Sequence, residues 1–358
     1  MAALQTSSLR DIARAAGVSA VSVSRALRNQ TGISENTRKR ILEIAQRQDY
    51  KPNPFVSTLM AHVRLQRPVA SAAAIAYIVP SLREFRAAWG YQKYFHGAKQ
   101  RASRLGYKVE LFSFEEYENN PRRLSDVLYS RGIRGVLLTA FPFSSPVFDL
   151  DWSRFCSATL GYTSEQPVLH RACCDHFHAM QLAFTRLTAA RYSRIGFYTL
   201  RIIDDWTRHH WTSAFLYNQQ QRKPRERVPV LLTEKPDEQA FKRWFLHHAP
   251  DALVTKHIQV LDWLKALGVH PPRAGFVHLD WIPEFGNIAG INQNSQLIAA
   301  AAVDLIVEQF HWNEGGVPSH PKAALIQNEW IAGRTVRTTP AEKLDANVAR
   351  PNTHHVSS

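Results

Sequence analysis

Short hydroxyl side chains occur repeatedly near the N-terminus, on both sides of Arg25, in a spacing suited to contact with a polyanion. Ser22, Ser24, Ser34 and Thr37 carry hydroxyls that can bond phosphate oxygens. The guanidinium of Arg25 can make a bidentate contact to a guanine in the major groove. A plain three-helix bundle with solvated charges would use the same residue types, so this spacing alone leaves two interpretations open.

A second group of reactive side chains lies near the middle of the chain. It contains Cys173, Cys174, Asp175, His176 and His178, which suggests a thiol nucleophile or a metal cluster. We favour neither, because the group opens a helical pattern in which an aspartate is a preferred cap and histidines are commonly solvated. The spacing expected of metal ligands is not completed elsewhere in the sequence.

Two adjacent histidine pairs, His209-His210 and His247-His248, point in different directions on a helix, so we interpret them as solvated. The sequence shows no Gly-rich phosphate-binding loop, nucleophile elbow or metalloprotease motif. It therefore predicts a protein that is not an enzyme and that uses no metal or cofactor.

Three short helical patterns position the N-terminal hydroxyls and the arginine. The first, over residues 9–16, stops at Gly17, which permits a turn conformation that other residues resist. The second starts at the N-cap Ser19, and the third runs from the N-cap Ser34 to about Arg47. The side chains expected in the small core are Leu9, Ile12, Ala13, Ala16, Val18, Val23, Ala26 and Leu27. A tight turn between the first two helices lets the second protrude toward base edges in a major groove.

Composition and charge agree with this interpretation. The chain has 358 residues, a net charge of +14 and an apolar fraction of 45%, as in ordinary globular proteins of more than one domain. Residues 1–67 hold eleven Lys or Arg against four Asp or Glu, which favours a nucleic-acid partner over a merely solvated surface. Three cysteines fit a reducing cytoplasm. The longest apolar run, residues 69–79, is too short to cross a bilayer, so we expect no membrane span or signal peptide.

The remainder of the chain alternates short strand-like and helical patterns. The expected strands cover residues 74–79, 108–112, 135–139, 194–198, 252–254, 275–278 and 323–326. The expected helices cover residues 91–105, 122–130, 178–189, 238–247, 259–267 and 295–309. Such alternation predicts parallel sheets with right-handed crossovers, and roughly 265 residues are more than one sheet needs, so we expect two α/β lobes.

The N-terminal motifs resemble the signature of the lactose-repressor (LacI/GalR) family of bacterial transcription regulators. Residues 8–27 read SLRDIARAAGVSAVSVSRAL, and the likeness continues through residues 33–38 and through Tyr50-Lys51-Pro52-Asn53. The resemblance implies that Ala20, Val21 and Arg25 read bases. It implies that the DNA backbone is held by Ser19, Ser22, Ser24, Ser34, Thr37 and Asn53. Lys51 lies in the last matching block, and Arg28, also expected at the DNA, stands where the family commonly has Asn.

Residues 54–60, Pro-Phe-Val-Ser-Thr-Leu-Met, resemble the family's hinge helix. In a dimer two such helices meet in the minor groove, and Leu59 falls on the position that wedges between base steps; the alternative is an apolar residue that faces another lobe. Pro54 departs from the family's usual Arg or Ala. Since Ala20 and Val21 offer only apolar contacts, we expect more of the discrimination to rest on Arg25 and on DNA shape.

The resemblance also implies a body similar to periplasmic sugar-binding proteins, with a small ligand in the cleft between two α/β lobes. Arg208 and Asp280 match residues that bond sugar hydroxyls, and Tyr91 or its neighbour Trp89 matches the aromatic that covers the ligand. The alternatives are a surface charge for Arg208, a helix cap for Asp280, and core or dimer surface for Trp89. Lys256-His257 stands near the family's usual Asn-Asp, which suggests the hypothesis of an acidic sugar or an oligosaccharide as ligand.

The sequence thus predicts a helix-turn-helix headpiece at residues 1–50 and a hinge helix with linker at 51–71. Residues 72–172 with 292–322 are expected to form an N-terminal lobe, and residues 173–291 with 323–337 a C-terminal lobe. A disordered tail is expected at 338–358. We predict a DNA-binding transcription regulator, a repressor rather than an activator, located at the bacterial nucleoid. It would bind a palindromic operator as a homodimer and would be controlled by a small, sugar-like effector.

Overall fold

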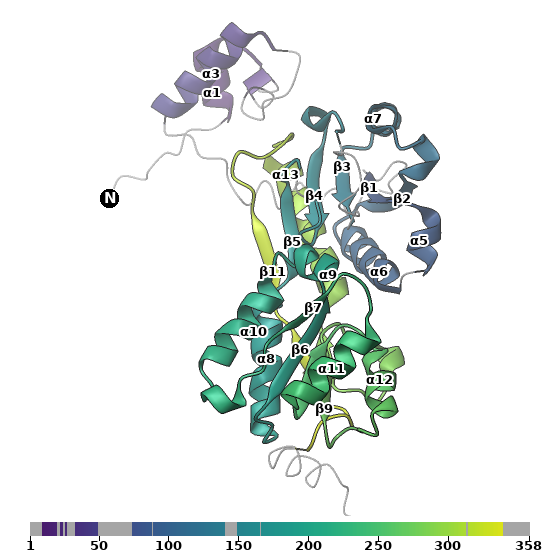
Figure 1. Ribbon diagram of the computed structural model, residues 1–358. Coiled ribbons are helices and arrows are strands. Elements are labelled where there is room, and N and C mark those ends of the chain that lie inside the picture. The colour runs from purple at the N-terminus through teal and green to yellow at the C-terminus, as the bar shows by residue number, and fades with distance from the viewer. Residues whose placement is uncertain are drawn as a thin grey trace, which may run out of the picture. The chain divides into compact units, whose positions relative to one another are not determined.

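The computed structural model describes residues 9–19, 22–23, 26, 33–48, 74–87, 89–139, 149–164, 166–312 and 314–338. The chain divides into two compact units (Figure 1). The first comprises residues 1–159, 166–170 and 300–322, and the second comprises residues 160–165, 171–299 and 323–358.

The N-terminal segment contains the helices α1 (Leu9–Ala16) and α3 (Glu35–Arg47). Ser34 caps α3 with an extended backbone, and its side chain accepts a bond from the Thr37 amide. Glu35 in the first turn and Arg47 in the last complement the helix dipole. Seven small or branched apolar side chains form the part of the core that the structure describes: Ile12, Ala13, Ala16, Val23, Ala26, Ile41 and Ala45. The cap and the core positions predicted from the sequence are confirmed here, whereas the side chains of Leu9 and Leu27 lie outside the described residues.

The body contains two six-stranded sheets, and parallel pairs dominate both. The order in the first is β11-β5-β4-β3-β1-β2 and in the second β12-β10-β9-β8-β6-β7. The strands are β1 (Ala74–Val79), β2 (Lys108–Ser113), β3 (Gly135–Leu138), β4 (Cys156–Leu160), β5 (His170–Cys174), β6 (Ile195–Leu200), β7 (Leu231–Thr233), β8 (Ala252–Thr255), β9 (Gly275–His278), β10 (Gly290–Asn292), β11 (Ala323–Ile326) and β12 (Glu329–Ile331). The predicted α/β body with parallel sheets is confirmed.

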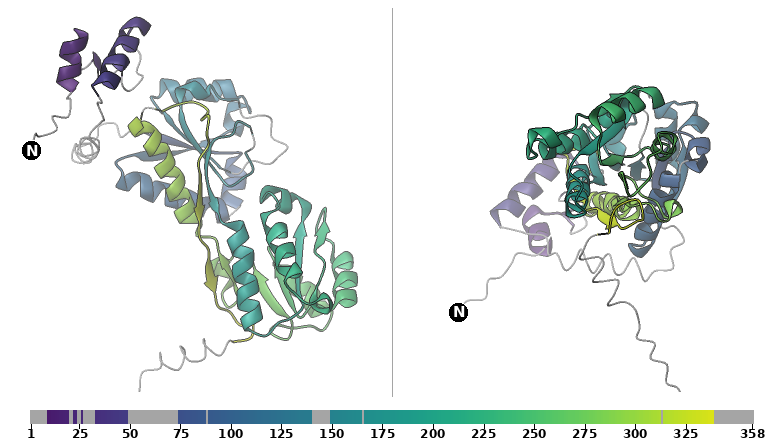
Figure 2. Two further views of the ribbon diagram at one scale, coloured as in Figure 1. Left: turned by 90° about the vertical axis from the view of Figure 1, so that its left-hand side faces the viewer. Right: turned by 60° about the horizontal axis from the view of Figure 1, so that its bottom comes forward.

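The helices of the body alternate with these strands. They are α5 (Leu82–Ala87), α6 (Trp89–Arg104), α7 (Pro121–Ser130), α8 (His176–Ala189), α9 (Arg201–Trp206), α10 (His210–Gln220), α11 (Glu238–His248), α12 (Val260–Ala266) and α13 (Ser295–Trp312). In the first unit, Gln309 near the end of α13 bonds both backbone groups of Ser157 in β4, which fixes this helix beside the first sheet (Figure 2).

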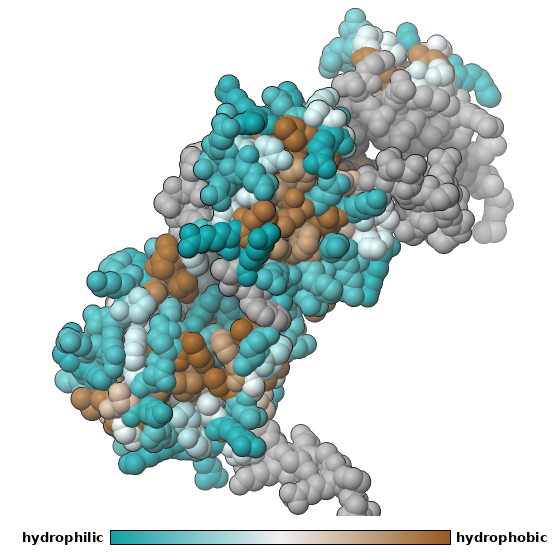
Figure 3. Space-filling model, turned by 90° about the vertical axis from the view of Figure 1, so that its right-hand side faces the viewer, coloured by the Kyte–Doolittle hydropathy of each residue, from teal (hydrophilic) through white to brown (hydrophobic). Residues whose placement is uncertain are grey.

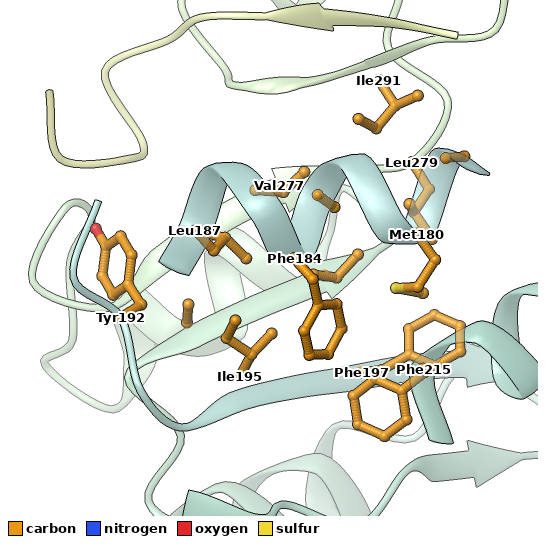
Figure 4. Packing of buried hydrophobic residues seen from close by; sticks show 14 of the residues in the cluster. Met180, Phe184, Leu187, Tyr192, Ile195, Phe197, Phe215, Val277, Leu279 and Ile291 are labelled. Atoms are coloured by element: carbon orange, nitrogen blue, oxygen red, sulfur yellow. The ribbon is translucent and has the colours of Figure 1, made fainter. Parts of the chain in front are cut away.

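The second sheet is covered on both faces, because its strands are apolar on both sides. Helices α8 and α10 lie on one side and α11 and α12 on the other (Figure 1). Alternate residues of β6 separate accordingly: Ile195 and Phe197 pack with α8 and α10, whereas Tyr198 packs with α11 and α12. Figure 4 shows Phe184 of α8 directed toward Phe197 and toward Phe215 of α10. This two-sided packing fixes the strand ends from which the polar loops emerge.

Candidate functional site

The turn after α1 has the backbone that a tight helix-turn-helix requires. Gly17 adopts φ +64°, a conformation that L side chains rarely take, and the Val18 amide bonds the Ala13 carbonyl at 3.0 Å. Val18 packs against the core of the N-terminal segment, as predicted. The helix start that follows is therefore held by backbone geometry.

Hydroxyl groups line the starts of the second helical stretch and of α3. The Ser19 and Ser22 hydroxyls lie 2.9 Å apart, and the Ser22 amide donates to the Ser19 oxygen at 3.1 Å. Ser34 repeats the arrangement with Thr37, whose hydroxyl lies 2.8 Å from that of Ser34. Ser19 and Ser34 are exposed. Both helix starts thus offer hydroxyls together with a positive dipole end, which is a geometry suited to phosphate.

The other residues predicted at the DNA fall outside the side chains that the structure describes. These are Ala20, Val21, Ser24, Arg25, Arg28, Lys51, Asn53 and Leu59. Their roles remain predictions from the sequence.

A polar cluster in the second unit gathers residues that follow strand ends. Lys256 follows β8 and Asp280 comes two residues after β9, both strands of the second sheet, whereas His176 comes two residues after β5 of the first sheet. Side chains at such ends form the usual ligand-binding edge of parallel sheets. We call the following six residues the sheet-end cluster: Tyr162, His176, Arg208, His210, Lys256 and Asp280.

An ion pair forms one side of the sheet-end cluster. The Lys256 ammonium lies 2.9 Å from the Asp280 carboxylate, and both side chains are about one-third exposed. Burial raises the pKa of Asp280, but the Lys256 charge and hydrogen bond outweigh burial, so the pKa lies below its usual value. Asp280 is thus a salt-bridge partner and not a helix cap, so the alternative interpretation of this residue is wrong.

Histidines beside this pair are held in their neutral form. Burial lowers the pKa of His176 to about 3 and the pKa values of His257 and His278 to about 4. The Asp280 amide donates to Nδ1 of His278 at 3.1 Å, so that nitrogen is the acceptor and the proton sits on Nε2. His257 packs on Tyr198, and its Nε2 is buried without a hydrogen-bond partner among the described residues.

Aromatic and imidazole rings form the other side of the sheet-end cluster. The ring of His210 meets Tyr162 edge-on at 5.1 Å, and His176 meets Trp211 in the same way at 5.1 Å. The exposed Arg208 places its guanidinium 5.7 Å from the Tyr162 ring centre. The turn that carries Arg208 is fixed by the buried Asp204, whose carboxylate bonds His209 at 2.7 Å and Thr212 at 2.5 Å.

The structure brings some of the predicted ligand residues together and separates others. Arg208, Lys256, His257 and Asp280 all belong to the second unit, whereas Trp89 and Tyr91 begin α6 in the first. Burial raises the pKa of Tyr91 to about 12, with a smaller contribution from Glu84. The side chain of Trp89 is outside the described residues, so its role stays a prediction.

Sequence reasoning missed three members of the sheet-end cluster. We expected His176 and His210 to be solvated, which is wrong: both are half-buried and pack against aromatic rings. No sequence pattern indicated Tyr162 as a site residue, because it follows β4, a strand that is absent from the strands predicted from the sequence. Asp175 does cap α8 through the His178 amide at 2.9 Å, as predicted. Cys173 and Cys174 are buried free thiols in β5.

A small helix-turn-helix segment ahead of two parallel-sheet lobes defines a class of proteins whose body has the fold of periplasmic binding proteins. The family model for bacterial regulatory proteins of the lacI family matches residues 8–53. Residues 8–53 are therefore identified with the lacI family.

The chain is also similar to named relatives and to solved structures. Catabolite control protein A of Streptococcus mutans is 25% identical over 209 residues, a match that covers 56% of this chain and 56% of that protein. A solved transcriptional regulator CelR–cellobiose complex aligns over 92% of this chain and 99% of that one, with a TM-score of 0.57 and 18% identity. A lac repressor dimer bound to operator and an anti-inducer aligns over 93% and 100%, with a TM-score of 0.53 and 16% identity. These structures support the fold of the body.

Membrane-spanning helices and metal clusters are both absent from the described ranges. No helix there combines the length and hydropathy that a membrane crossing requires. No group of three His, Cys, Asp or Glu side chains in the same ranges could hold a metal ion.

Proposed function

We propose that this chain is a sequence-specific DNA-binding transcription regulator whose DNA affinity is controlled by a small ligand at the sheet-end cluster. The observation that carries the proposal is the pair of hydroxyl-lined helix starts, Ser19 with Ser22 and Ser34 with Thr37, in a segment that matches the lacI family model. The related proteins are named as regulators and not as enzymes, which supports a regulatory role. The proposal places the chain in the bacterial cytoplasm with the DNA.

The finer form of the proposal is a homodimeric repressor with a palindromic operator. One headpiece reads about half of such a site, so a two-fold dimer would match it. Apolar side chains reach the molecular surface in patches among hydrophilic ones (Figure 3), and such patches can serve as subunit contacts. Among the described residues, the exposed large hydrophobic side chains include Tyr217, Leu246 and Leu297.

The proposed effector is a carbohydrate. Aromatic and imidazole rings can cover sugar C–H faces, while Arg208, Lys256 and Asp280 can bond hydroxyls. The cellobiose complex of the similar CelR regulator supports this class of ligand.

Fluorescence anisotropy with the full chain tests the proposal. Duplexes selected from a random library should bind tightly and with strong salt dependence. The Arg25→Ala variant should lose about 1–3 kcal/mol and relax specificity at one base pair of each half-site. Arg14→Ala serves as the control, since Arg14 is 83% exposed on α1 and pairs only weakly with Asp11 at 3.7 Å. Equal affinity for selected and random duplexes would show that binding does not depend on the DNA sequence, which would overturn sequence-specific recognition.

Sedimentation and expression measurements test the finer form. A monomer at micromolar concentration that still binds its selected duplex would overturn the dimer. Reporter transcription from a promoter that carries the duplex should fall when the chain is expressed, and a rise would overturn the repressor role.

A further inference from the structure

Two successive residues in the turn between α9 and α10 adopt a backbone conformation that L side chains rarely take. Arg208 has φ +48° and His209 has φ +58°, and neither is a glycine, which would take this conformation without steric cost. Such a turn persists only where the surrounding contacts hold it. The same turn leads to two members of the sheet-end cluster: the guanidinium of Arg208 and the ring of His210 lie 5.7 and 5.1 Å from the ring centre of Tyr162. The geometry of the cluster therefore depends on what holds the turn.

The buried carboxylate of Asp204 makes contacts on both sides of this turn. Its side chain is 6% exposed, and its two oxygens have different partners: Nδ1 of His209 at 2.7 Å and the hydroxyl of Thr212 at 2.5 Å. The backbone carbonyl of Asp204 also accepts the His209 amide at 2.8 Å. Asp204 lies in the first turn of α9 and Thr212 in the first turn of α10. One side chain thus joins both helices to the turn between them.

A carboxylate is a poor choice for a buried position that serves stability alone. Taking it out of water carries a large desolvation penalty, and an apolar side chain of similar volume is often at least as stabilising. An apolar side chain, however, cannot accept hydrogen bonds from His209 and Thr212 and so fix the direction of the turn. The side chain of His209 is 61% exposed, so this contact lies at the surface of the second unit. The contacts of Asp204 therefore serve the shape of the turn rather than the packing of the core.

We propose that Asp204 is a positioning residue of the effector site, which holds the left-handed turn so that Arg208 and His210 lie against Tyr162 before the effector binds. A site that already has its bound geometry loses less free energy to ordering when the ligand enters, so the affinity is higher. Loss of the Asp204 contacts should therefore weaken effector binding although Arg208 and His210 are both still present. This inference rests on the proposed function, because it concerns the effector site of the same regulator.

Hydrogen exchange and calorimetry on the full chain test this inference with Asp204→Asn. Asparagine has nearly the same shape, but only one of its two terminal atoms is an acceptor. The amides of residues 207–210 all bond backbone carbonyls, and their exchange, read by mass spectrometry, should accelerate in the ligand-free variant. The calorimetric probe is the sugar that binds the unmodified chain most tightly among glucose, galactose, maltose, cellobiose, glucuronate and galacturonate. Its Kd should rise about 10-fold in Asp204→Asn, because a charge-assisted bond that orders the site is lost.

A double-mutant cycle distinguishes positioning from a general loss of stability. His209→Ala removes the other end of the contact at an exposed position, so it should raise the Kd of the same sugar while the melting temperature stays close to that of the unmodified chain. If Asp204 acts through His209, the double variant should bind no more weakly than the weaker single variant; multiplied losses would contradict the inference. Asp205→Asn is the matched control, because this neighbouring carboxylate is 43% exposed and lies 4.0 Å from Nε2 of His209. Should Asp204→Asn not fold, the Kd of His209→Ala decides.

Unchanged exchange or an unchanged Kd in Asp204→Asn would overturn the inference, and so would a failure of all six sugars to bind the unmodified chain. DNA binding separates this inference from the proposed function. A chain that binds its selected duplex, but whose sugar affinity does not depend on Asp204, keeps the proposed function and refutes the positioning role. A chain whose sugar affinity depends on Asp204, but which binds no selected duplex, keeps the positioning role and refutes the proposed function.

Discussion

The N-terminal segment and the second unit differ in the size and composition of their hydrophobic cores. Among the described residues, the core of the N-terminal segment holds seven buried residues, mostly Ala and Ile, whereas one core cluster of the second unit holds nineteen and includes large aromatic rings. The small core can do little more than fix the angle between short helices. The large core fixes the ends of five parallel strands and their neighbours, so it can position side chains that are far apart in sequence. The first region is therefore specified by local sequence and the second by its topology.

The greatest loss of stability is expected from a truncation in the aromatic core of the second unit. Phe215 is fully buried and packs against Phe184 and Phe197 at 5.7 and 5.5 Å. Phe215→Ala should lower the free energy of unfolding by about 3–5 kcal/mol, because the aromatic layer cannot collapse into the space. Urea unfolding followed by tryptophan fluorescence measures this, since every tryptophan lies at or beyond Trp89. Leu216→Ala, at a position 48% exposed, is the control and should cost under about 1 kcal/mol.

The corresponding change in the N-terminal segment should leave the unfolding transition measured by tryptophan fluorescence unchanged. Ile41 is fully buried in the seven-residue core, so Ile41→Ala should cost about 3 kcal/mol and unfold much of this small segment. DNA binding in the anisotropy assay should be lost, while the tryptophan transition stays where it was. Leu42→Ala, at a position 45% exposed on the same helix, should preserve both signals. A shift of the tryptophan transition in Ile41→Ala would show that the two regions do not fold independently.

Lowering the pH should destabilise the second unit but not the N-terminal segment, and the loss of stability should be smaller than in the two core variants. Burial lowers the pKa of His278 from 6.5 to about 4, so between these values the unfolded chain binds a proton that the folded chain does not. The contribution of His278 to the stability of the second unit therefore falls as the pH falls through this window, by about 1.4 kcal/mol per pH unit and about 2 kcal/mol at pH 5, and His176 and His257 add to this loss. Residues 1–61 contain no histidine, so the N-terminal segment should be insensitive there.

The slope of stability against pH is the readout that isolates His278. His278→Gln should reduce the slope of the unfolding free energy against pH by close to about 1.4 kcal/mol per pH unit, which corresponds to one proton. This reduction is expected whatever the variant does to absolute stability. His247→Gln changes an exposed histidine of α11 and should leave the slope as it was. A slope that is equal in both variants would assign the acid sensitivity to other groups.

The smallest effect concerns the helix cap of the N-terminal segment. Ser34→Ala removes the side-chain acceptor of the Thr37 amide and should destabilise α3 by about 1 kcal/mol. Hydrogen exchange of the α3 amides, read by mass spectrometry, should accelerate accordingly. Ser34→Asp restores an acceptor and should slow the exchange again, while its negative charge weakens DNA binding. Unchanged exchange in Ser34→Ala would mean that the cap is dispensable.

Much of the fold follows from local patterns. The strands β1, β9 and β11 have the bounds that the sequence predicts, because each is a short, mainly apolar run between turn residues. Strand β5 was missed, since its sequence HRACC places a histidine and an arginine in a strand that is buried throughout. Helix α10 was missed as well, although Trp211, Ala214 and Phe215 face the core. The sequence interpretation treats His209 and His210, the N-cap and first residue of this helix, as solvated.

Local sequence specifies the N-terminal segment, because caps, a glycine turn and a few apolar positions act over neighbouring residues. The sequence also indicates Arg208, Lys256 and Asp280, through resemblance to a family. The tertiary fold pairs Lys256 with Asp280, since the two residues follow adjacent parallel strands, β8 and β9. It likewise brought His176 and His210 against Tyr162. The physical reason is that parallel strands need long crossovers, so the residues that meet at their ends are never neighbours in the chain.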